Sequence, residues 1–567
     1  MTHGATATAS KTGAGVAPNA PPPPLTRQGA LRRRVPVVPV VLGLTALVVL
    51  VPLVALLTSL ARPSTDVWAH LWSTRLPGML LSTTVLVVGV TASAAVLGTA
   101  LAWLVAAHRF PGRGLLVWLL AMPLAVPAYV SGFVWLDTVD ESGPVGTWWT
   151  GLVGADAWYP NVRSLPWAGL VLTLSLYPYV YLLGLAAFRD LPAGRWETAR
   201  ILSGSRWRAF RDVALPAARG AVIAGSVLVA LEVLTDVGTV RLFNVQTVAD
   251  GVFRVWFGLA DREAATELAG LLLLAAVAVL LAERRAAARR HEATGGRDTA
   301  RLEPEVLSGW SRLAVVGAVV VVLVALVFPV ARLVGWTIEA VQRGTTASAA
   351  GGLGHHLWSS LVVTGWTVLA CVVVGVAVAV AARWGRRRHH RTLAGATTLG
   401  YGLPGPVIAL GVLVVLAAVD RTGWLPRGTL LVGSLVGLVL ALVVRYLALA
   451  VKPAEQAVGR VGRSTEDAAR ALGASPSGVV GRVQLPLAAQ GLAVAGALVA
   501  LDVVKELPAT LLLRPFGVDT LPVWVWEVSS DSRWVEAGPP ALALVALAAV
   551  PTALLLRLVI RGRRVDW

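Results

Sequence analysis

The feature that most constrains this chain is a series of apolar segments, each long enough to cross a lipid bilayer. A membrane-spanning helix needs about 20 mostly apolar residues, because each residue adds about 1.5 Å of rise. Twelve segments of the 567-residue chain meet this requirement. They are residues 36–60, 82–106, 115–136, 167–187, 219–240, 264–282, 312–335, 357–382, 394–418, 429–450, 488–511 and 539–560. The predicted fold class is therefore all-α, a polytopic membrane protein with about 12 transmembrane helices.

The overall composition supports a membrane environment and argues against nucleic-acid binding. Hydrophobic residues make up 56% of the chain and charged residues only 14%, whereas soluble proteins carry about 25% charged residues. The surplus of apolar surface has to face a lipid bilayer. The net charge of +18 comes from arginines that lie between apolar segments, not on one folded face as a nucleic-acid-binding surface requires. No nucleic-acid partner is expected.

The positions of the basic residues predict how the chain is oriented. Loops rich in Lys and Arg lie on the cytoplasmic side of a membrane. In this chain the basic residues 32–34 precede the first predicted span. Basic loops then follow every second span, at residues 108–113, 189–219, 284–301, 383–391, 452–482 and 561–564. Both termini are therefore predicted to be cytoplasmic, in a multi-pass protein of the cell (inner or plasma) membrane.

The polar stretches divide the chain into two halves of similar size. Residues 1–34, rich in Ala, Gly, Thr and Pro, are predicted to be a disordered cytoplasmic tail. The first half is predicted at 35–282, with its core at about 77–282, and the second at 312–560, with its core at about 356–558. Residues 283–311 form the polar linker between them, and residues 561–567 form a second cytoplasmic tail.

An internal repeat relates the two longest cytoplasmic loops at one constant offset in the numbering. Residues 197–203 of the first loop match residues 467–473 of the second, and a Leu-Pro pair follows each at the same distance. The matched residues are Glu197, Thr198, Ala199, Ser203, Leu215 and Pro216 in the first loop, and Asp467, Ala468, Ala469, Gly473, Leu485 and Pro486 in the second.

Each loop is predicted to form a short helix, a turn and a second short helix. Ser464 and Asp467 have the spacing of a capping box, and Pro216 and Pro486 suit the first turn of a following helix. Each loop would present an acidic end and small residues to a partner at the cytoplasmic face.

The loop pattern resembles the EAA loop of ABC importer permeases of the type I fold, the binding-protein-dependent inner-membrane components. That motif reads Glu-Ala-Ala, three residues, Gly, nine residues, Ile-x-Leu-Pro. The second loop differs by Asp467 for Glu and Val483 for Ile, and the first by Thr198 for Ala and Ser203 for Gly. The resemblance implies that two copies of an ABC ATPase dock on these loops, one on each. It also implies that an extracytoplasmic solute-binding protein delivers the cargo.

Within this family, the fused layout of two halves resembles the ferric-iron permeases. The stretches at 236–240 and 505–515 are similar to runs in the iron group. The resemblance implies ferric iron as the cargo, with thiamine or another small solute as the alternative, since thiamine permeases share the layout.

Charged residues recur at corresponding places near two predicted spans. They are Glu232, Asp236, Asp502, Lys505 and Glu506. The acidic residues of each half are four apart, so each pair is predicted to share one helix face. Charges at membrane depth are costly, so these side chains either line the transport path or hold the halves together, or they form an ion-pair network with Arg241 or Lys505. A proton relay in an ion-coupled secondary transporter is the alternative from another functional class.

The sequence lacks the residues for ATP hydrolysis or for a metal centre. A phosphate-binding loop needs Gly-Lys-Ser/Thr after a Gly-rich run, and none of Lys11, Lys452 and Lys505 completes it. The chain is therefore not predicted to be an enzyme or to hold a cofactor, and ATP and Mg²⁺ would bind to the partner ATPase. Adjacent histidines such as 355–356 and 389–390 point about 100° apart on a helix, so no metal site is predicted. The single Cys371 excludes an intrachain disulfide.

Overall fold

The computed structural model describes residues 37–60, 65–154, 156, 158–259, 261–288, 302–307, 309, 311–344, 346–385, 388–423, 426 and 430–561. The predicted tail at 1–34 lies outside the described residues. Residues 289–301 of the predicted linker and residues 562–567 at the C-terminal end also lie outside them.

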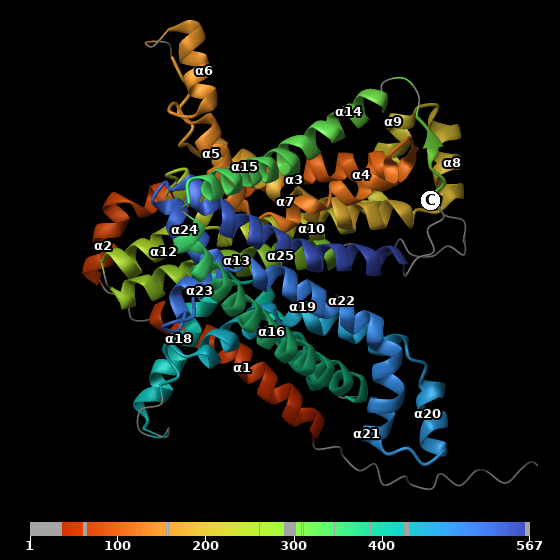
Figure 1. Cartoon of the computed structure of the whole chain (residues 1–567). Helices are drawn as coiled ribbons and strands as arrows, with labels where there is room; N and C mark the ends of the chain where they lie inside the picture. Colours follow the sequence, from red (N-terminus) through yellow and green to blue (C-terminus); the bar gives the residue numbers. More distant parts are fainter. Residues whose placement is uncertain are drawn as a thin grey trace, which may run out of the picture. The chain divides into compact units, whose positions relative to one another are not determined.

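Helices make up almost all of the described chain, which confirms the predicted all-α polytopic fold (Figure 1). Ten helical stretches are long and apolar enough to cross a membrane. They are formed by α1 (Val37–Leu60), α3 (Leu76–Ala107), α7 (Leu165–Arg189), α10 (Leu215–Thr235), α13 (Arg262–Ala288), α14 and α15 (Ser311–Val322 and Phe328–Gln342), α16 (Thr346–Trp384), α19 (Leu435–Arg460), α22 (Leu485–Val504) and α25 (Trp534–Arg561).

Shorter elements connect these helices. They are α2 (Thr65–Thr74), α6 (Pro144–Val153), α8 (Ala193–Ser203), α9 (Arg206–Ala209), α11 (Gly238–Leu242), α12 (Val248–Phe253), α20 (Arg463–Ala471), α21 (Pro476–Val479), α23 (Pro508–Leu513) and α24 (Leu521–Ser530). One small parallel sheet joins β1 (His108–Arg109) to β2 (Glu305–Val306).

Two of the twelve predicted spans are not single helices. The segment predicted at 115–136 consists of α4 (Arg113–Leu119), a short 3₁₀ turn and α5 (Ala128–Val139), with a bend of 91° at the break. The segment predicted at 394–418 consists of α17 (Arg388–Ala396), another 3₁₀ turn and α18 (Gly405–Arg421). Both breaks fall at a proline with extended backbone, Pro127 and Pro404. Proline lacks the N–H of a helix interior and disfavours helical geometry in the residue before it.

The offset that pairs position 197 with position 467 also relates the helices of the two halves. The starts of α3, α7 and α10 at positions 76, 165 and 215 correspond to those of α16, α19 and α22 at 346, 435 and 485. The short helices α9 and α21 correspond in the same way, and each is followed by one π-helical turn. The repeat predicted from two loops therefore extends to the boundaries of the membrane helices.

The hydrophobic packing joins the two halves. In one core, Phe133 of α5 stacks on Trp336 of α15 and on Trp534 of α25, with ring centroids 5.8 and 5.9 Å apart. In the other, α1 and α13 pack with α16, α18 and α19. Gly411 of α18 allows this approach, because a Cβ there would lie 2.6 Å from the carbonyl oxygen of Pro52 in α1. Each core thus contains helices from both halves.

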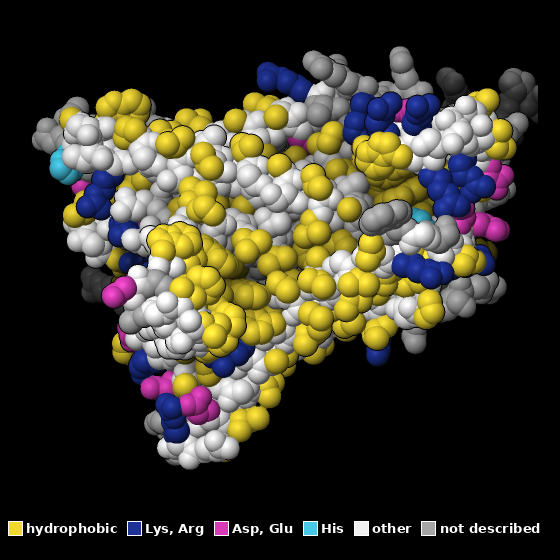
Figure 2. Space-filling view, turned by 90° about the horizontal axis from the view of Figure 1, so that it is seen from above, with side chains coloured by type: hydrophobic (Ala, Val, Ile, Leu, Met, Phe, Trp, Pro, Cys, Tyr) yellow, Lys and Arg dark blue, Asp and Glu magenta, His cyan; other side chains and the backbone are white. Residues whose placement is uncertain are grey.

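The surface matches a chain embedded in lipid. Large apolar side chains such as Leu44, Val88 and Trp366 are more than half exposed on membrane helices. On the face seen in Figure 2, hydrophobic side chains fill the middle, whereas Lys, Arg, Asp and Glu gather toward the ends. Such an apolar band between polar ends is what a lipid bilayer requires.

Candidate functional site

The first matched loop forms the predicted helix-turn-helix. α8 and α9 are joined by a turn, and a π-helical turn then leads into α10, which carries Leu215 and Pro216 in its first turn. Glu197 and Thr198 are exposed on α8, while Ala199 and Ser203 are half-buried. The Ser205 hydroxyl accepts a hydrogen bond from the Arg208 N–H and caps α9. The acidic end of the loop is therefore accessible, as predicted.

The second loop has the same plan, formed by α20 and α21. Asp467, Ala468 and Gly473 are exposed, Ala469 is half-buried, and Leu485 and Pro486 begin α22. The predicted capping box is wrong, because α20 begins at Arg463 after Gly462 and no side chain caps it. Ser464 therefore lies inside the first turn.

A glycine with left-handed backbone ends the first helix of each loop. Gly473 has φ +88°, and its N–H donates to the Arg470 carbonyl. In the first loop Ser203 occupies the matching position, but the next residue, Gly204, has φ +61° and donates to the Arg200 carbonyl. Only glycine adopts this conformation without steric cost. The departure at Ser203 thus moves the left-handed glycine by one residue and keeps the turn.

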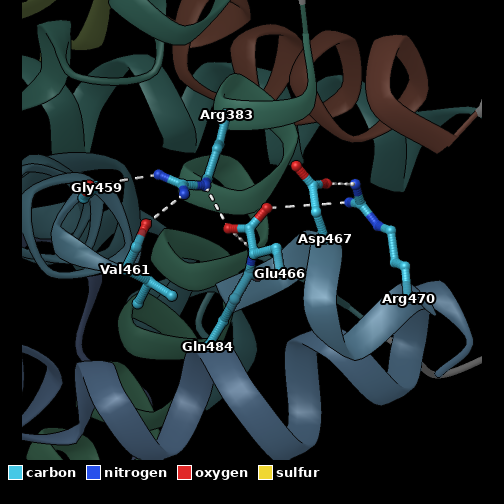
Figure 3. A network of polar contacts seen from close by, with 7 residues as sticks. All are labelled: Arg383, Gly459, Val461, Glu466, Asp467, Arg470 and Gln484. Atoms are coloured by element: carbon cyan, nitrogen blue, oxygen red, sulfur yellow. Dashed lines mark hydrogen bonds and ion pairs between the residues drawn. The ribbon is translucent and has the colours of Figure 1, made fainter. Parts of the chain in front are cut away.

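A buried ionic contact anchors the second loop (Figure 3). Glu466, 4% exposed, accepts hydrogen bonds from Arg383 Nε at 2.7 Å and from Gln484 Nε2 at 2.8 Å. The Arg383 guanidinium also donates to the carbonyl oxygen of Val461 at 2.5 Å. Asp467, the next residue, points to solvent and pairs only with Arg470 at 3.3 Å among the described residues. The sequence comparison with the EAA motif had not identified Glu466.

An aromatic cluster anchors the first loop at the equivalent position. Trp196, which the repeat matches with Glu466, is buried and packs edge-on against Trp103 of α3 at 5.0 Å. Trp103 also contacts Phe188 of α7 at 5.2 Å and Phe210 at 4.9 Å. The two loops therefore have the same backbone arrangement, but aromatic packing holds the first loop and a buried ion pair holds the second. A tryptophan in a polar loop is the sequence signal for this anchor.

The five charged residues singled out in the sequence line one cavity of about 90 Å³. Its walls come from α7 and α10 of the first half and from α19 and α22 of the second. Asp236 and Glu506 lie just beyond the ends of α10 and α22. The prediction that each acidic pair shares a helix face is therefore wrong, because both helices end between the two residues.

The cavity charges are partly paired. Lys505 Nζ lies 3.3 Å from Asp502. Glu506 accepts hydrogen bonds from Arg445 at 2.7 Å, from the Tyr446 hydroxyl at 2.5 Å and from the Ala509 N–H at 2.8 Å. Arg445 and Tyr446 were not among the predicted site residues, although an arginine inside an apolar span is itself a signal.

Asp236 is the residue of the first half that the repeat matches with Glu506. Like Glu506, it accepts a hydrogen bond from a backbone N–H at the start of a short helix. Its carboxylate accepts from the Thr239 hydroxyl at 2.9 Å and from the Val240 N–H at 3.0 Å, and so caps α11. Lys505 pairs as expected, whereas Arg241 lies 3.9 Å from Asp250 and not beside the cavity carboxylates.

Neither histidine pair forms part of a metal-binding group. His355 Nε2 lies 3.1 Å from the Gly517 carbonyl oxygen, and His356 stacks on Trp524 at 4.4 Å. Over the described ranges of the chain, no three His, Cys, Asp or Glu residues are grouped to hold a metal ion.

Comparison with known proteins gives the same assignment as the loops. The family described as binding-protein-dependent transport system inner membrane component matches residues 94–282. The chain is similar to an Fe(3+)-transport system permease protein of Haemophilus influenzae, with 27% identity over 86% of this chain and 90% of the relative. It is also similar to a sulfate transport system permease protein (33% identity) and a molybdenum transport system permease protein (28%) of Escherichia coli. Each of these alignments covers 26% of this chain, and they span 50% and 62% of the relatives. The chain is thus a multi-pass membrane protein, and its residues 94–282 match the family of binding-protein-dependent transport permeases.

Proposed function

We propose that this chain is the membrane subunit of an ATP-driven importer whose cargo is ferric iron. An external solute-binding protein would deliver the cargo to the outer mouth, and two copies of an ABC ATPase would dock on the loops α8–α9 and α20–α21. ATP and Mg²⁺ would bind to the ATPase, so this chain would catalyse no covalent step.

The observation that carries this proposal is the pairing of the two loops. They agree helix by helix at the constant offset of the repeat, and in Figure 1 they lie at the same end of the membrane helices. Each presents an exposed carboxylate, Glu197 or Asp467, followed by small residues. Two equivalent loops at one end of the helices suit a partner that is present in two copies. An ABC importer has two ATPase subunits of this kind.

The proposed topology has twelve crossings, with both termini in the cytoplasm. Ten crossings are the continuous apolar stretches. The other two are the broken segments 113–139 and 388–421. The halves are 35–282 and 312–560, joined by the cytoplasmic linker 283–311. With an even number of crossings, both termini and both docking loops lie on one side, where the basic residues are concentrated.

The cavity favours a cation over an oxyanion as cargo. Four carboxyl side chains line it, from Glu232, Asp236, Asp502 and Glu506, against the two cations of Arg445 and Lys505. Relatives of this chain are named as Fe(3+), sulfate or molybdenum transport permeases. An acidic path lowers the energy of a multivalent cation and raises that of an anion, which supports iron.

The proposed mechanism is a switch between two arrangements of the halves. ATP-driven closure of the ATPase dimer pulls the two docking loops together, and the halves rock between inward-open and outward-open states. The ATP-bound dimer prefers one state, which shifts the population.

A docking test uses the second loop. We expect the double variant Asp467→Arg, Gly473→Arg to lose most of the ATPase that copurifies with the wild-type chain, because it reverses the exposed charge and fills the turn. Glu455→Arg, at the cytoplasmic end of α19, is the control for reversal of one acidic charge and should retain the ATPase. Undiminished ATPase association and uptake in the double variant would contradict the docking assignment.

A cargo test uses proteoliposomes that contain the chain, its ATPase and its binding protein. We expect ATP-dependent uptake of radioactive Fe³⁺ and no uptake of sulfate, molybdate or thiamine. Uptake driven by a proton gradient without the ATPase would instead indicate an ion-coupled carrier.

A further inference from the structure

The segment between the halves is attached to the first half along residues 302–307, beside the first docking loop. β2 pairs in parallel with β1, with His108 opposite Glu305. The Leu307 N–H donates to the Arg109 carbonyl at 3.3 Å, and the Leu302 N–H donates to the Leu191 carbonyl at 2.9 Å. Leu302 itself is buried in the core that contains Phe133 and Trp336. We call residues 302–307 the strap.

The strap also carries a charge that binds two arginines of the loop. Glu305 accepts a hydrogen bond from Arg200, near the end of α8, and lies 3.1 Å from Arg206, the first residue of α9. One carboxylate therefore joins both helices of the loop. At the equivalent position of the second loop, Arg470 pairs with Asp467 and Glu466 of its own helix. Among the described residues, the ion pairs of the strap are with the first loop.

The exposed side chains of the two loops differ in character. The strapped loop exposes Ile201 by 80%, Leu202 by 81%, Trp207 by 67% and Val306 by 77%. Within residues 461–484, all of which are described, Leu472 is the one large hydrophobic side chain with comparable exposure, at 89%. The same stretch exposes the charged side chains of Asp467, Arg470 and Arg482.

We propose that the strap is a built-in part of the first docking surface, and that the two docking surfaces are chemically unequal. An ATPase subunit binds the first loop through apolar contacts on a loop clamped by Glu305, and binds the second loop through polar contacts. This inference rests on the proposed function, since the ATPase is the occupant of both surfaces.

The physical reason is the balance of charge and area at each loop. Glu305 offsets the positive charge of Arg200 and Arg206, which flank Ile201, Leu202 and Trp207 in the sequence. Apolar side chains then contribute more of the binding energy there than at the second loop, beside the exposed charges of Arg195, Glu197 and Arg208. Salt screens the apolar part little. Contacts of exposed charges at the second loop weaken as salt shortens the Debye length.

The experiment measures the ATPase that copurifies with the full-length chain when one loop at a time is blocked. Asp467→Arg with Gly473→Arg blocks the second loop, so retention reports on the first. Leu202→Asp with Trp207→Asp blocks the first, so retention reports on the second. Between about 0.1 M and 0.5 M salt, we expect retention through the first loop to change less than about twofold and retention through the second to fall about tenfold.

The strap itself is tested in the chain whose second loop is blocked. Glu305→Ala should lower the remaining ATPase retention roughly threefold to tenfold, because two partly exposed ion pairs are lost. Glu303→Ala, an exposed acidic residue on the same segment, is the matched control and should have no such effect. Glu305→Arg combined with Arg200→Glu and Arg206→Glu should restore retention, which separates loss of the clamp from failure to fold.

Several outcomes would overturn the inference. Equal effects of Glu305→Ala and Glu303→Ala would remove the strap from the docking surface. Equal salt dependence at the two loops would remove the chemical difference. Full ATPase retention by the Leu202→Asp, Trp207→Asp chain would mean that these side chains serve another contact, such as the lipid surface. If the wild-type chain retains no ATPase, the proposed function itself fails.

Discussion

At the scale of single residues, His108 lies where the strap meets the first half. Its Nδ1 is 3.2 Å from the Leu104 carbonyl oxygen, and it pairs in the sheet with Glu305. Burial lowers the pKa of His108, and the nearby cations of Arg206 and Arg113 lower it further, while Glu305 and the contact with Leu104 act in the opposite direction. A neutral imidazole is therefore favoured while the strap is attached.

This pKa shift predicts how strap attachment depends on pH. The detached state binds a proton more tightly, so attachment is strongest above the ordinary histidine pKa of about 6.5 and weakens as the pH falls below it. We expect hydrogen exchange at the Leu307 amide, corrected for its intrinsic rate, to accelerate between about pH 7.5 and pH 5.5. His108→Gln should remove this dependence. An unchanged pH profile in that variant would show that another group is responsible.

At the scale of secondary-structure elements, the two docking loops have one plan and two anchors. α8 is held by Trp196 within an aromatic cluster, and α20 is held by Glu466 bound to Arg383. Loss of a buried tryptophan costs about 3–5 kcal/mol through lost contacts and the cavity that remains. Removal of one partner of a buried ion pair costs a similar amount, because the other charge stays unpaired.

The anchors predict separate local effects. Trp196→Ala should accelerate hydrogen exchange in α8 and leave α20 unchanged, and Glu466→Ala should do the reverse. Each variant is thus the control for the other, measured in one sample of the full-length chain. Acceleration of both helices by either variant would show that the loops are not held independently.

At the scale of the whole molecule, the charged cavity joins the two halves. Glu232 and Asp236 come from the first half, and Asp502, Lys505 and Glu506 from the second. Lys505 Nζ also lies 5.9 Å from the ring centre of Tyr179 in α7. Any rocking of the halves has to change these contacts, so the cavity is where docking-loop movement would reach the transport path.

The cavity predicts a separation of transport from docking. Glu506→Gln should lower iron uptake and thermal stability, because it weakens charge-assisted bonds to Arg445 and Tyr446 and costs on the order of 3 kcal/mol. ATPase retention should remain normal. Glu232→Gln, on the first-half side of the same cavity, is the matched variant. It should lower thermal stability less, because among the described residues the Glu232 carboxylate makes no hydrogen bond or ion pair within 4 Å. Loss of ATPase retention in Glu506→Gln would contradict a role confined to the cavity.

The all-α class, the repeat and the helix-turn-helix form of the two matched loops could all be predicted from the residues alone. The lengths of the apolar segments identify membrane helices without any tertiary information. The matched polar residues set the register of the repeat independently of the helix boundaries. Gly204 shows the limit of such matching. The motif glycine is missing at Ser203, and Gly204, one position later, makes the turn instead.

Which distant residues meet became clear only in the folded molecule. Glu466 with Arg383, Glu506 with Arg445, Glu305 with Arg200 and Gly411 with Pro52 are contacts between segments far apart in the chain. Helical periodicity places a residue on a face but does not select the neighbouring helix, because an apolar segment packs equally well against many others. The partner is chosen by the close fit of particular side chains, and that fit exists only once the helices have packed.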